Sequence, residues 1–452
     1  MPSIRKDLHW SKHLNAFTVF TMLQWFVMML LNAMVIPLSI AHLFHLTAQE
    51  TSLFLSNTFF FVGLFSLIQV LFGHKLPIID GPAGIWWGVI FITFQINSQL
   101  GMDKLLIGQG LELGFIAVGV YLYAMGICRL TGKISALFSP LVNGVFMLIM
   151  PFSMSGTLLK GMLGLDSATS FNGKIAVSSI LLFVFILFIS RLKRIKWISS
   201  FSLLIGIVMG WLLFLLLGFR ENIVLEPLFS YPTLFFWGMP QLDWGILSVT
   251  FITGFIMLAH VTVSIQSMAL VSKKEISSQV YDSTSKISGI SYVLTGLSGV
   301  IGLLPLASSS SVVSLSGVFS RVPFILASIL MISLGFFRGM SNILSSIPEP
   351  VIYTVLFILF IQLVEIGFKF FELIEMNSKQ LFIISFSLLL GMGVMFLPPS
   401  FIQLFHPVVG NIVGNGLVVA ILCSVLLEQS FNLSKRWGEP KWQMENFKKR
   451  WM

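Results

Sequence analysis

A run of small and polar residues, Asp80-Gly81-Pro82-Ala83-Gly84, interrupts an apolar stretch directly before Ile85-Trp86-Trp87. Inside a membrane, an unpaired backbone N–H or C=O costs several kcal/mol, so irregular backbone survives there only where protein buries it or where it lines a cavity. A helix that starts near Pro82 would direct its free N–H groups into such a cavity. Broken segments of this kind often hold a transported solute.

A second run of this kind, Pro305-Leu306-Ala307 followed by the four serines Ser308 to Ser311, lies in the C-terminal half of the chain. It would present a second helix N-terminus from the opposite direction. Two facing positive dipole ends suit an electron-rich solute that accepts hydrogen bonds. The alternative is a pair of kinked spans that pack through small residues.

His260 lies in the middle of an apolar stretch, where an ionisable group is costly and functional by default. Imidazole also changes charge near neutral pH, so His260 is a candidate for solute binding and proton coupling. Ser264, four residues on, shares its helix face. The alternative is a neutral imidazole that hydrogen-bonds between helices.

Three further residues accompany these candidates. Asp80, beside the break, is a second coupling candidate, although capping of the following half-helix is the role that we expect for it. Gln24 is interpreted as an interhelical hydrogen-bonder. Trp86 offers a stacking face, but packing is the expected role of both Trp86 and Trp87.

The remaining chemistry-bearing residues point to structural roles. Glu112 and Glu365 are expected at helix interfaces or in ion pairs, and Lys369 lies four residues after Glu365. Cys128 and Cys423 indicate neither a disulfide framework nor a metal site. The sequence contains no Walker loop and no nucleophile elbow, which argues against a soluble enzyme and against ATP-driven transport. We expect no cofactor and no metal.

The elements that must position these residues are membrane spans. The chain is 56% hydrophobic and 10% charged, and apolar stretches of about 20 residues recur along it. The net charge of +9 does not indicate nucleic-acid binding, because Lys and Arg cluster in alternate loops. We predict an all-α polytopic membrane protein with fourteen segments, at 17–42, 50–72, 78–97, 105–129, 134–153, 174–191, 198–218, 246–271, 288–306, 309–320, 323–340, 350–368, 380–397 and 408–428.

The segments divide into two halves of seven. Because seven is odd, the second half enters the membrane from the opposite side, which predicts an inverted repeat with short extended pieces in segments three and ten. The first repeat covers 1–220 and the second 246–430, with a connecting loop at 221–245 and a cytoplasmic tail at 431–452. The bias of Lys and Arg places both termini in the cytoplasm.

At these residues the chain resembles the nucleobase–ascorbate transporter family, also called nucleobase:cation symporter-2, over nearly its whole length. The matching motifs are Gln24-Trp25 with the later Pro37, Leu76-Pro77 with Gly81-Pro82, Ser316-Gly317-Val318-Phe319-Ser320-Arg321, and Ile347-Pro348-x-Pro350-Val351. The variant Gly81-Pro82-Ala83-Gly84-Ile85-Trp86-Trp87-Gly88 is similar to a divergent bacterial branch of purine permeases.

The resemblance implies a core domain built from segments 1–4 and 8–11 and a gate domain built from segments 5–7 and 12–14. It also implies a substrate held between short strands in segments three and ten, and uptake coupled to protons, with sodium as the other possible ion. An elevator-type motion, a homodimer and a location in the bacterial cell membrane are further implications.

The chain departs from the family at its usual site residues. The family's eighth-helix Glu falls on His260 and a later His of some members on Ser264, while the Glu-Asn or Gln-Asn pair of segment ten falls on Ser308-Ser309. The backbone amides of Ala83, Gly84 and Ala307 would still bind one edge of a base. We therefore expect a secondary transporter of a purine or related nucleobase. The alternatives are an anion carrier of sulfate-permease architecture, a non-transporting membrane receptor and an intramembrane enzyme.

Overall fold

The computed structural model describes residues 16–134, 139–165, 172–191, 202–219, 229, 231–272, 276–310, 313, 319–398, 401 and 404–431. Most of predicted segment ten, part of the predicted connecting loop and all but the first residue of the predicted tail lie outside this description. The Ser316-Arg321 motif is described only from Phe319 onward.

Helices make up most of the described chain. They are α1 (Ala16–Leu43), α2 (Ala48–Phe72), α3 (Gly84–Gln99), α4 (Lys104–Ile127), α5 (Thr131–Ile134), α6 (Pro140–Leu163), α7 (Gly173–Ser190), α9 (Ser202–Leu216), α10 (Trp244–Ser272), α11 (Ser278–Leu297), α13 (Arg321–Phe336), α14 (Arg338–Ser345), α15 (Glu349–Phe371), α16 (Ser378–Met395), α18 (Pro407–Gly414) and α19 (Gly416–Ser430). Two short strands, β1 (Asp80–Pro82) and β2 (Leu303–Pro305), interrupt them.

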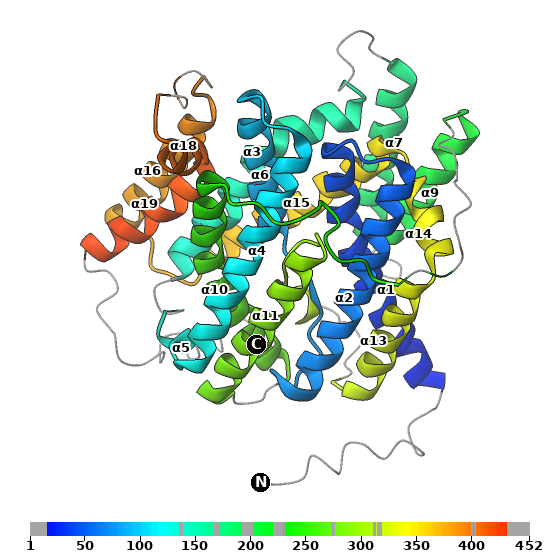
Figure 1. The fold of residues 1–452 in the computed structure, drawn as a ribbon, viewed down its shortest axis with the longest axis horizontal. Helices are drawn as coiled ribbons and strands as arrows, with labels where there is room; N and C mark the ends of the chain where they lie inside the picture. The colour runs from blue at the N-terminus through cyan, green and yellow to red at the C-terminus, as the bar shows by residue number, and fades with distance from the viewer. Residues whose placement is uncertain are drawn as a thin grey trace.

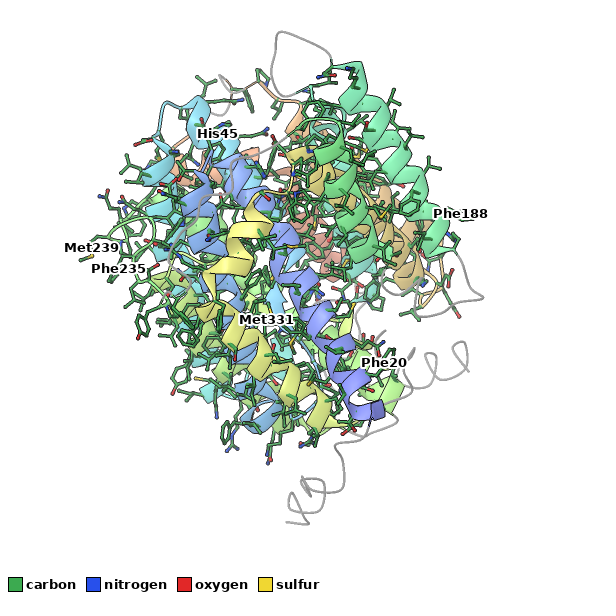
Figure 2. The ribbon with its side chains drawn as sticks, turned by 90° about the vertical axis from the view of Figure 1, so that its right-hand side faces the viewer. Phe20, His45, Phe188, Phe235, Met239 and Met331 are labelled. Atoms are coloured by element: carbon green, nitrogen blue, oxygen red, sulfur yellow. The ribbon has the colours of Figure 1, made fainter. Side chains whose placement is uncertain are left out.

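The composition of these helices fits a lipid environment. Among the described residues, eight helices are long and apolar enough to span a membrane, and three shorter apolar helices accompany them. Large apolar side chains such as Phe20 on α1 and Phe188 on α7 are exposed at the outside of the bundle (Figure 2). Exposed apolar side chains of this kind are favourable in contact with lipid, whereas in water they would promote aggregation.

The helices pack into two groups. In the first group α4 packs along α11, α2 packs along α13, and α1 and α10 cross these pairs. In the second group α6 packs along α15, α16 along α19, and α7 along α9. In Figure 1, α2, α11 and α13 occupy the lower part of the view, and α7, α16 and α19 lie in the upper part.

The helix contacts recur in pairs. The contact of α4 with α11 has its counterpart in that of α13 with α2, and α10 with α4 corresponds to α1 with α13. In the second group, α16 with α19 corresponds to α7 with α9, and α16 with α6 to α7 with α15. In each correspondence, every helix of the N-terminal half is replaced by a helix of the C-terminal half, and the reverse.

Glycines bring α4 and α11 together closely. A Cβ atom on Gly289 would lie 2.5 Å from the backbone N of Tyr123, and one on Gly119 would lie 2.7 Å from the carbonyl oxygen of Gly289. Both neighbours are backbone atoms that cannot rotate away. Small residues at such a crossing are typical of helix packing within membranes.

Predicted segment nine, at 288–306, was placed wrongly. The helix there is α11, which begins at Ser278 and ends at Leu297, before β2. Hydropathy missed its first turns because they contain many hydroxyl groups, but these groups face protein: Thr284 and Ser285 are buried, and the Ser285 hydroxyl donates 2.8 Å to the Leu122 carbonyl on α4.

Two other predicted boundaries differ from the structure. Predicted segment five, at 134–153, is α6 from Pro140 to Leu163, because Ser139 caps its N-terminus and accepts a hydrogen bond from Val142 N. The last predicted segment, at 408–428, is divided at Asn415, whose side chain caps α19.

Gly289→Val should destabilise the protein, because the added side chain collides with backbone atoms of α4. Overpacking of a tight core costs about 1–3 kcal/mol, and we expect a lower thermal midpoint of the purified protein in detergent. Gly393→Val on α16 is the matched control, since a Cβ there meets no atom within 4 Å. Equal midpoints of both variants would contradict the close crossing.

Candidate functional site

The two broken elements meet. β1 and β2 pair in an antiparallel register that joins Asp80 to Pro305, Gly81 to Leu304 and Pro82 to Leu303, and all six residues are buried. The expectation of short extended pieces is thus confirmed for segment three. The second piece lies before predicted segment ten, within the range predicted for segment nine.

Ile79 extends this pairing beyond the strands. Its carbonyl oxygen accepts a hydrogen bond from Leu306 N at 2.8 Å, and its N–H donates to the Ser309 hydroxyl at 3.0 Å. These bonds satisfy backbone groups that would otherwise be unpaired at the break. Ser309, a predicted solute contact, therefore holds the two broken elements together.

α3 begins directly after β1. Its N-cap residue is Ala83, which has extended backbone angles and no side-chain cap, so the prediction that Asp80 caps this half-helix was wrong. The first N–H groups of a helix have no intrahelical acceptor. The amides of Gly84 and Ile85 are of this kind, and they carry the positive end of the helix dipole.

α10 crosses β2 at His260 and Ser264. The Ser264 hydroxyl is buried and lies 2.7 Å from the Pro305 carbonyl and 2.9 Å from that of His260. The His260 ring is half-buried, interacts with the backbone of Pro305, and leaves its Nδ1 atom without a hydrogen bond in the described structure. Ser264 thus anchors the strand, and His260 retains unused hydrogen-bonding capacity beside it.

The first turns of α3 face the second group of helices. A Cβ on Gly84 would lie 3.3 Å from Met150 Cε on α6 and 4.0 Å from Leu363 on α15. One on Gly88 would lie 3.6 Å from both Met150 and Leu417, the latter on α19. The N-terminal end of α3, called its free end below, therefore lies at the junction of the two helix groups, and its neighbours there are apolar.

The serine loop places its residues differently. Ala307 is half-buried, Ser308 is exposed and Ser309 is buried. Only the start of the segment that follows is described. The structure thus brings Asp80, Ala83, Gly84, His260, Ser264, Ala307 and Ser309 together around the paired strands, and Ser308 extends from their edge.

The two predicted tryptophans are packing residues. Trp86 is fully buried, donates 2.6 Å to the Tyr292 hydroxyl and meets the Phe115 ring edge-on. Trp87 donates to Ser39 on α1 and packs against Phe360 on α15. Gln24 is buried on α1, and no hydrogen bond of the described residues links it to the strands.

Sequence reasoning missed His74. Its Nε2 atom lies 3.7 Å from Asp80 Oδ2, and both side chains are buried. Its Nδ1 atom accepts a hydrogen bond from Leu76 N at 3.1 Å, and Asp80 N donates to Ser66 Oγ at 3.0 Å. The only sequence signal is a lone histidine six residues before the acid, where hydropathy predicts an exposed turn.

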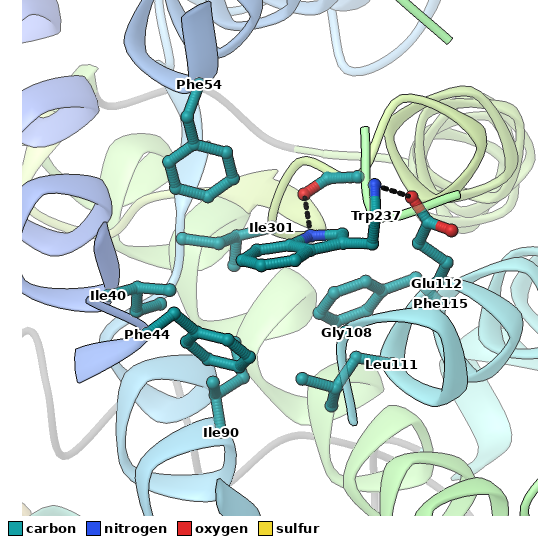
Figure 3. A pocket seen from close by; sticks show the side chains of 11 residues that line it. Ile40, Phe44, Phe54, Ile90, Gly108, Leu111, Glu112, Phe115, Trp237 and Ile301 are labelled. Carbon is teal, nitrogen blue, oxygen red and sulfur yellow. Dashed lines mark hydrogen bonds between the residues drawn. The ribbon is translucent and has the colours of Figure 1, made fainter. Parts of the chain in front are cut away.

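Glu112 lies away from the paired strands and holds the loop that precedes α10 (Figure 3). Its Oε1 atom accepts a hydrogen bond from Trp237 N at 3.2 Å, and the Trp237 ring donates 3.1 Å to the Gly299 carbonyl. The ring lies between Phe44 and Phe54 in a cavity with room for about one water molecule. Glu112 thus fixes the loop before α10, and no ion pair of it is observed in the described chain.

Glu365 forms an ion pair, as expected, and the observed partner is Arg191. Its Oε1 atom lies 3.4 Å from Arg191 Nη2, and both side chains are largely exposed. The pair joins α15 to the end of α7. An exposed ion pair contributes little to stability.

Ser309→Ala should loosen the strand pair, because the buried amide of Ile79 loses its acceptor. An unsatisfied buried donor costs about 1–3 kcal/mol, and hydrogen exchange of the peptide around Ile79 should accelerate. Ser310→Ala is the control, since among the described residues its hydroxyl bonds only to the nearby Ala307 carbonyl. Unchanged exchange in Ser309→Ala would contradict the role of the Ser309 hydroxyl.

Comparison with known proteins gives relatives over nearly the whole chain. The chain is 28% identical to "Putative purine permease YwdJ" of Bacillus subtilis over 92% of its own length and 96% of that protein. It is 23% identical to "Uric acid permease PucJ" of the same species, covering 93% and 94% of the two chains. It is 24% identical to "Xanthine permease XanP" of Escherichia coli, covering 93% of each.

Solved structures share the fold. The transmembrane domain of the cyanobacterial bicarbonate transporter BicA matches with a TM-score of 0.57 over 91% of this chain and 96% of that one, at 13% identity. The murine anion transporter Slc26a9 matches with a TM-score of 0.65 over 95% and 70%, at 12% identity. Residues 17–400 match the model of the permease family Xan_ur_permease. This chain, a multi-pass membrane protein, therefore belongs to that permease family.

Proposed function

We propose that this protein is a secondary transporter that takes up a purine or a related nucleobase by proton symport. Its family and its relatives support the nucleobase class, since those relatives are named as purine, uric acid and xanthine permeases. The single structural observation that carries the proposal is the pairing of β1 with β2 beneath His260.

The paired strands offer hydrogen-bond donors for the edge of a planar heterocycle. The amides of Ala83 and Gly84 bind one side of the base, and Ala307 and the exposed Ser308 bind it from the other. His260 supplies a side-chain hydrogen bond through its unused Nδ1 atom. Backbone donors suit this family member because the sequence lacks the carboxylates that the resemblance would place here. Ser264 and Ser309 support the strands.

The helix contacts support a seven-plus-seven inverted repeat. Exchange of the two halves carries α4–α11 onto α13–α2 and α16–α19 onto α7–α9. β1 pairs with β2, as expected when both lie on the pseudo-two-fold axis. The first helix group is then the core domain and the second the gate domain.

An elevator-type motion carries the base. The side chains that surround the free end of α3 are apolar, namely Met150, Leu363 and Leu417. Apolar surfaces can slide past each other without exposing unpaired hydrogen-bonding groups. The core domain moves against the gate domain and carries the strand pair with it. The coupling residue is His260 or Asp80.

The function is tested with purified protein. A ligand that binds only the native state raises the thermal midpoint, so xanthine, uric acid, uracil, sulfate and bicarbonate are compared at equal concentration. We expect stabilisation by a purine and none by the oxyanions. Uptake of the same purine into proteoliposomes then separates a transporter from a receptor. Stabilisation by oxyanions alone would favour an anion carrier, with which the fold is shared.

His260→Ala should abolish purine uptake at normal abundance in the membrane, because the base loses its side-chain hydrogen bond. Uptake of labelled xanthine into vesicles checks this, and the exposed His406→Ala is the matched control. Full transport by His260→Ala would remove His260 from the mechanism.

Gly84→Val should weaken base binding by about tenfold or more, which corresponds to about 1.4 kcal/mol. The valine side chain fills the space between the free end of α3 and Met150. Calorimetric titration of the purine measures the loss. Gly156→Val, on the same helix as Met150, meets no atom within 4 Å of its Cβ and should bind normally. Equal affinities of the two variants would place the base elsewhere.

A further inference from the structure

The pair of Asp80 and His74 has no explained role in the fold. Asp80 is fully buried, yet neither of its carboxyl oxygens has a hydrogen bond in the described structure, and His74 Nε2 also lacks one. Buried polar groups are nearly always satisfied, and an exception calls for an explanation. The distance between Nε2 and Oδ2, 3.7 Å, is too long for a hydrogen bond but short enough for a small movement to close.

The hydrogen bond on the other side of the ring decides the tautomer of His74. Because Nδ1 accepts from Leu76 N, it carries no proton, and the neutral ring must carry its proton on Nε2. That N–H faces Asp80. A second proton cannot join the ring unless the bond to Leu76 breaks. An additional proton therefore goes to the Asp80 carboxyl group.

The charged surroundings favour this distribution. Arg321, at the start of α13, acts electrostatically on His74 and opposes a positive charge on it. From α11, the Tyr292 hydroxyl is the titratable group that interacts with Asp80. β2 contains no titratable side chain. α1 contains His42 and α2 contains Glu50. β1 meets α1 near Asn32, ten residues before His42, and Asp80 bonds Ser66 on α2, sixteen residues after Glu50.

We propose that Asp80 is the proton-binding site that couples transport, and that His74 is its positioning residue. A proton from water on one side of the membrane forms an O–H bond with a carboxylate oxygen of Asp80, and it returns to water on the other side. His74 keeps its Nε2 proton throughout and donates a hydrogen bond to Asp80 when the carboxylate is charged. This assignment rests on the proposed function, and it selects Asp80 over His260 as the coupling residue.

The position of Asp80 explains how its charge state would affect solute binding. Asp80 begins β1, its backbone binds Ser66 on α2, and it lies directly opposite Pro305. Attraction between a charged Asp80 and the N–H of His74 would shift β1 relative to β2. The amides of Ala83 and Gly84 lie three and four residues after Asp80 in the sequence, so they would move with β1. A charged carboxylate within the membrane is also costly, so its protonation eases movement of the core domain.

The first experiment does not depend on any solute. Infrared spectroscopy of the full-length protein in lipid detects the carbonyl band of a protonated carboxyl group. We expect a component that declines as the pH is raised, that is absent in Asp80→Asn, and that remains in Glu112→Gln, the control for another buried acid. In His74→Phe the pH midpoint of this band should move to higher pH, because the charged carboxylate loses its donor. His74→Gln, which supplies an N–H donor again, should reverse part of that shift. A spectrum unchanged by Asp80→Asn would overturn the proposal.

The second experiment measures coupling in proteoliposomes with labelled xanthine. One proton per base and a gradient of one pH unit give about tenfold accumulation for the wild type. Asp80→Asn should retain exchange of internal for external xanthine but stop at equal concentrations, whereas Glu112→Gln should accumulate normally. Accumulation by Asp80→Asn, or accumulation driven only by sodium, would refute the proton site. Absence of xanthine and other nucleobase exchange in the wild type would instead refute the proposed function, and the infrared result would still decide the proton site.

Discussion

The pairing of two three-residue strands is the interaction on which the rest of this structure depends. Each strand interrupts a helical segment, and the backbone groups released by that interruption have no water to bind in the middle of a membrane. β1 and β2 satisfy one another, and Leu306, Ser309 and Ser264 complete the set through Ile79 and Pro305. Only with these bonds can helix α3 begin inside the bundle, with its N-terminal amides available.

The surrounding helices are arranged to hold this pair. α1 and α10 pass over β1 and β2 respectively, and α2 and α11 pack behind them. Glycines such as Gly119 and Gly289 permit the close crossing of α4 with α11, so one group of helices forms a tight body around the strands. The second group meets the free end of α3 through apolar side chains. The boundary between the two groups of helices is therefore apolar at this point.

The two buried acids differ in the partners that the fold gives them. Glu112 binds the backbone of Trp237, and the bond fixes a loop on the bundle. Asp80 has a comparable degree of burial but no hydrogen bond to either oxygen among the described residues, and a histidine stands just out of reach. Hydropathy assigns the same cost to both. Their partners, which come from distant parts of the chain, differ: Glu112 binds a backbone N–H, and Asp80 faces an imidazole.

The sequence by itself determined the membrane class, most helix positions and the two breaks, because hydrocarbon enforces long apolar stretches and makes Gly, Pro and Ser conspicuous within them. It also singled out Ala83, Gly84 and His260, which the structure places beside the paired strands. Tertiary structure alone decided that α11 begins at Ser278, that Ser264 and Ser309 hold strands, and that His74 faces Asp80. The physical reason is that a hydroxyl or imidazole facing another helix has the same local sequence as one facing water, so only the packed fold reveals its partner.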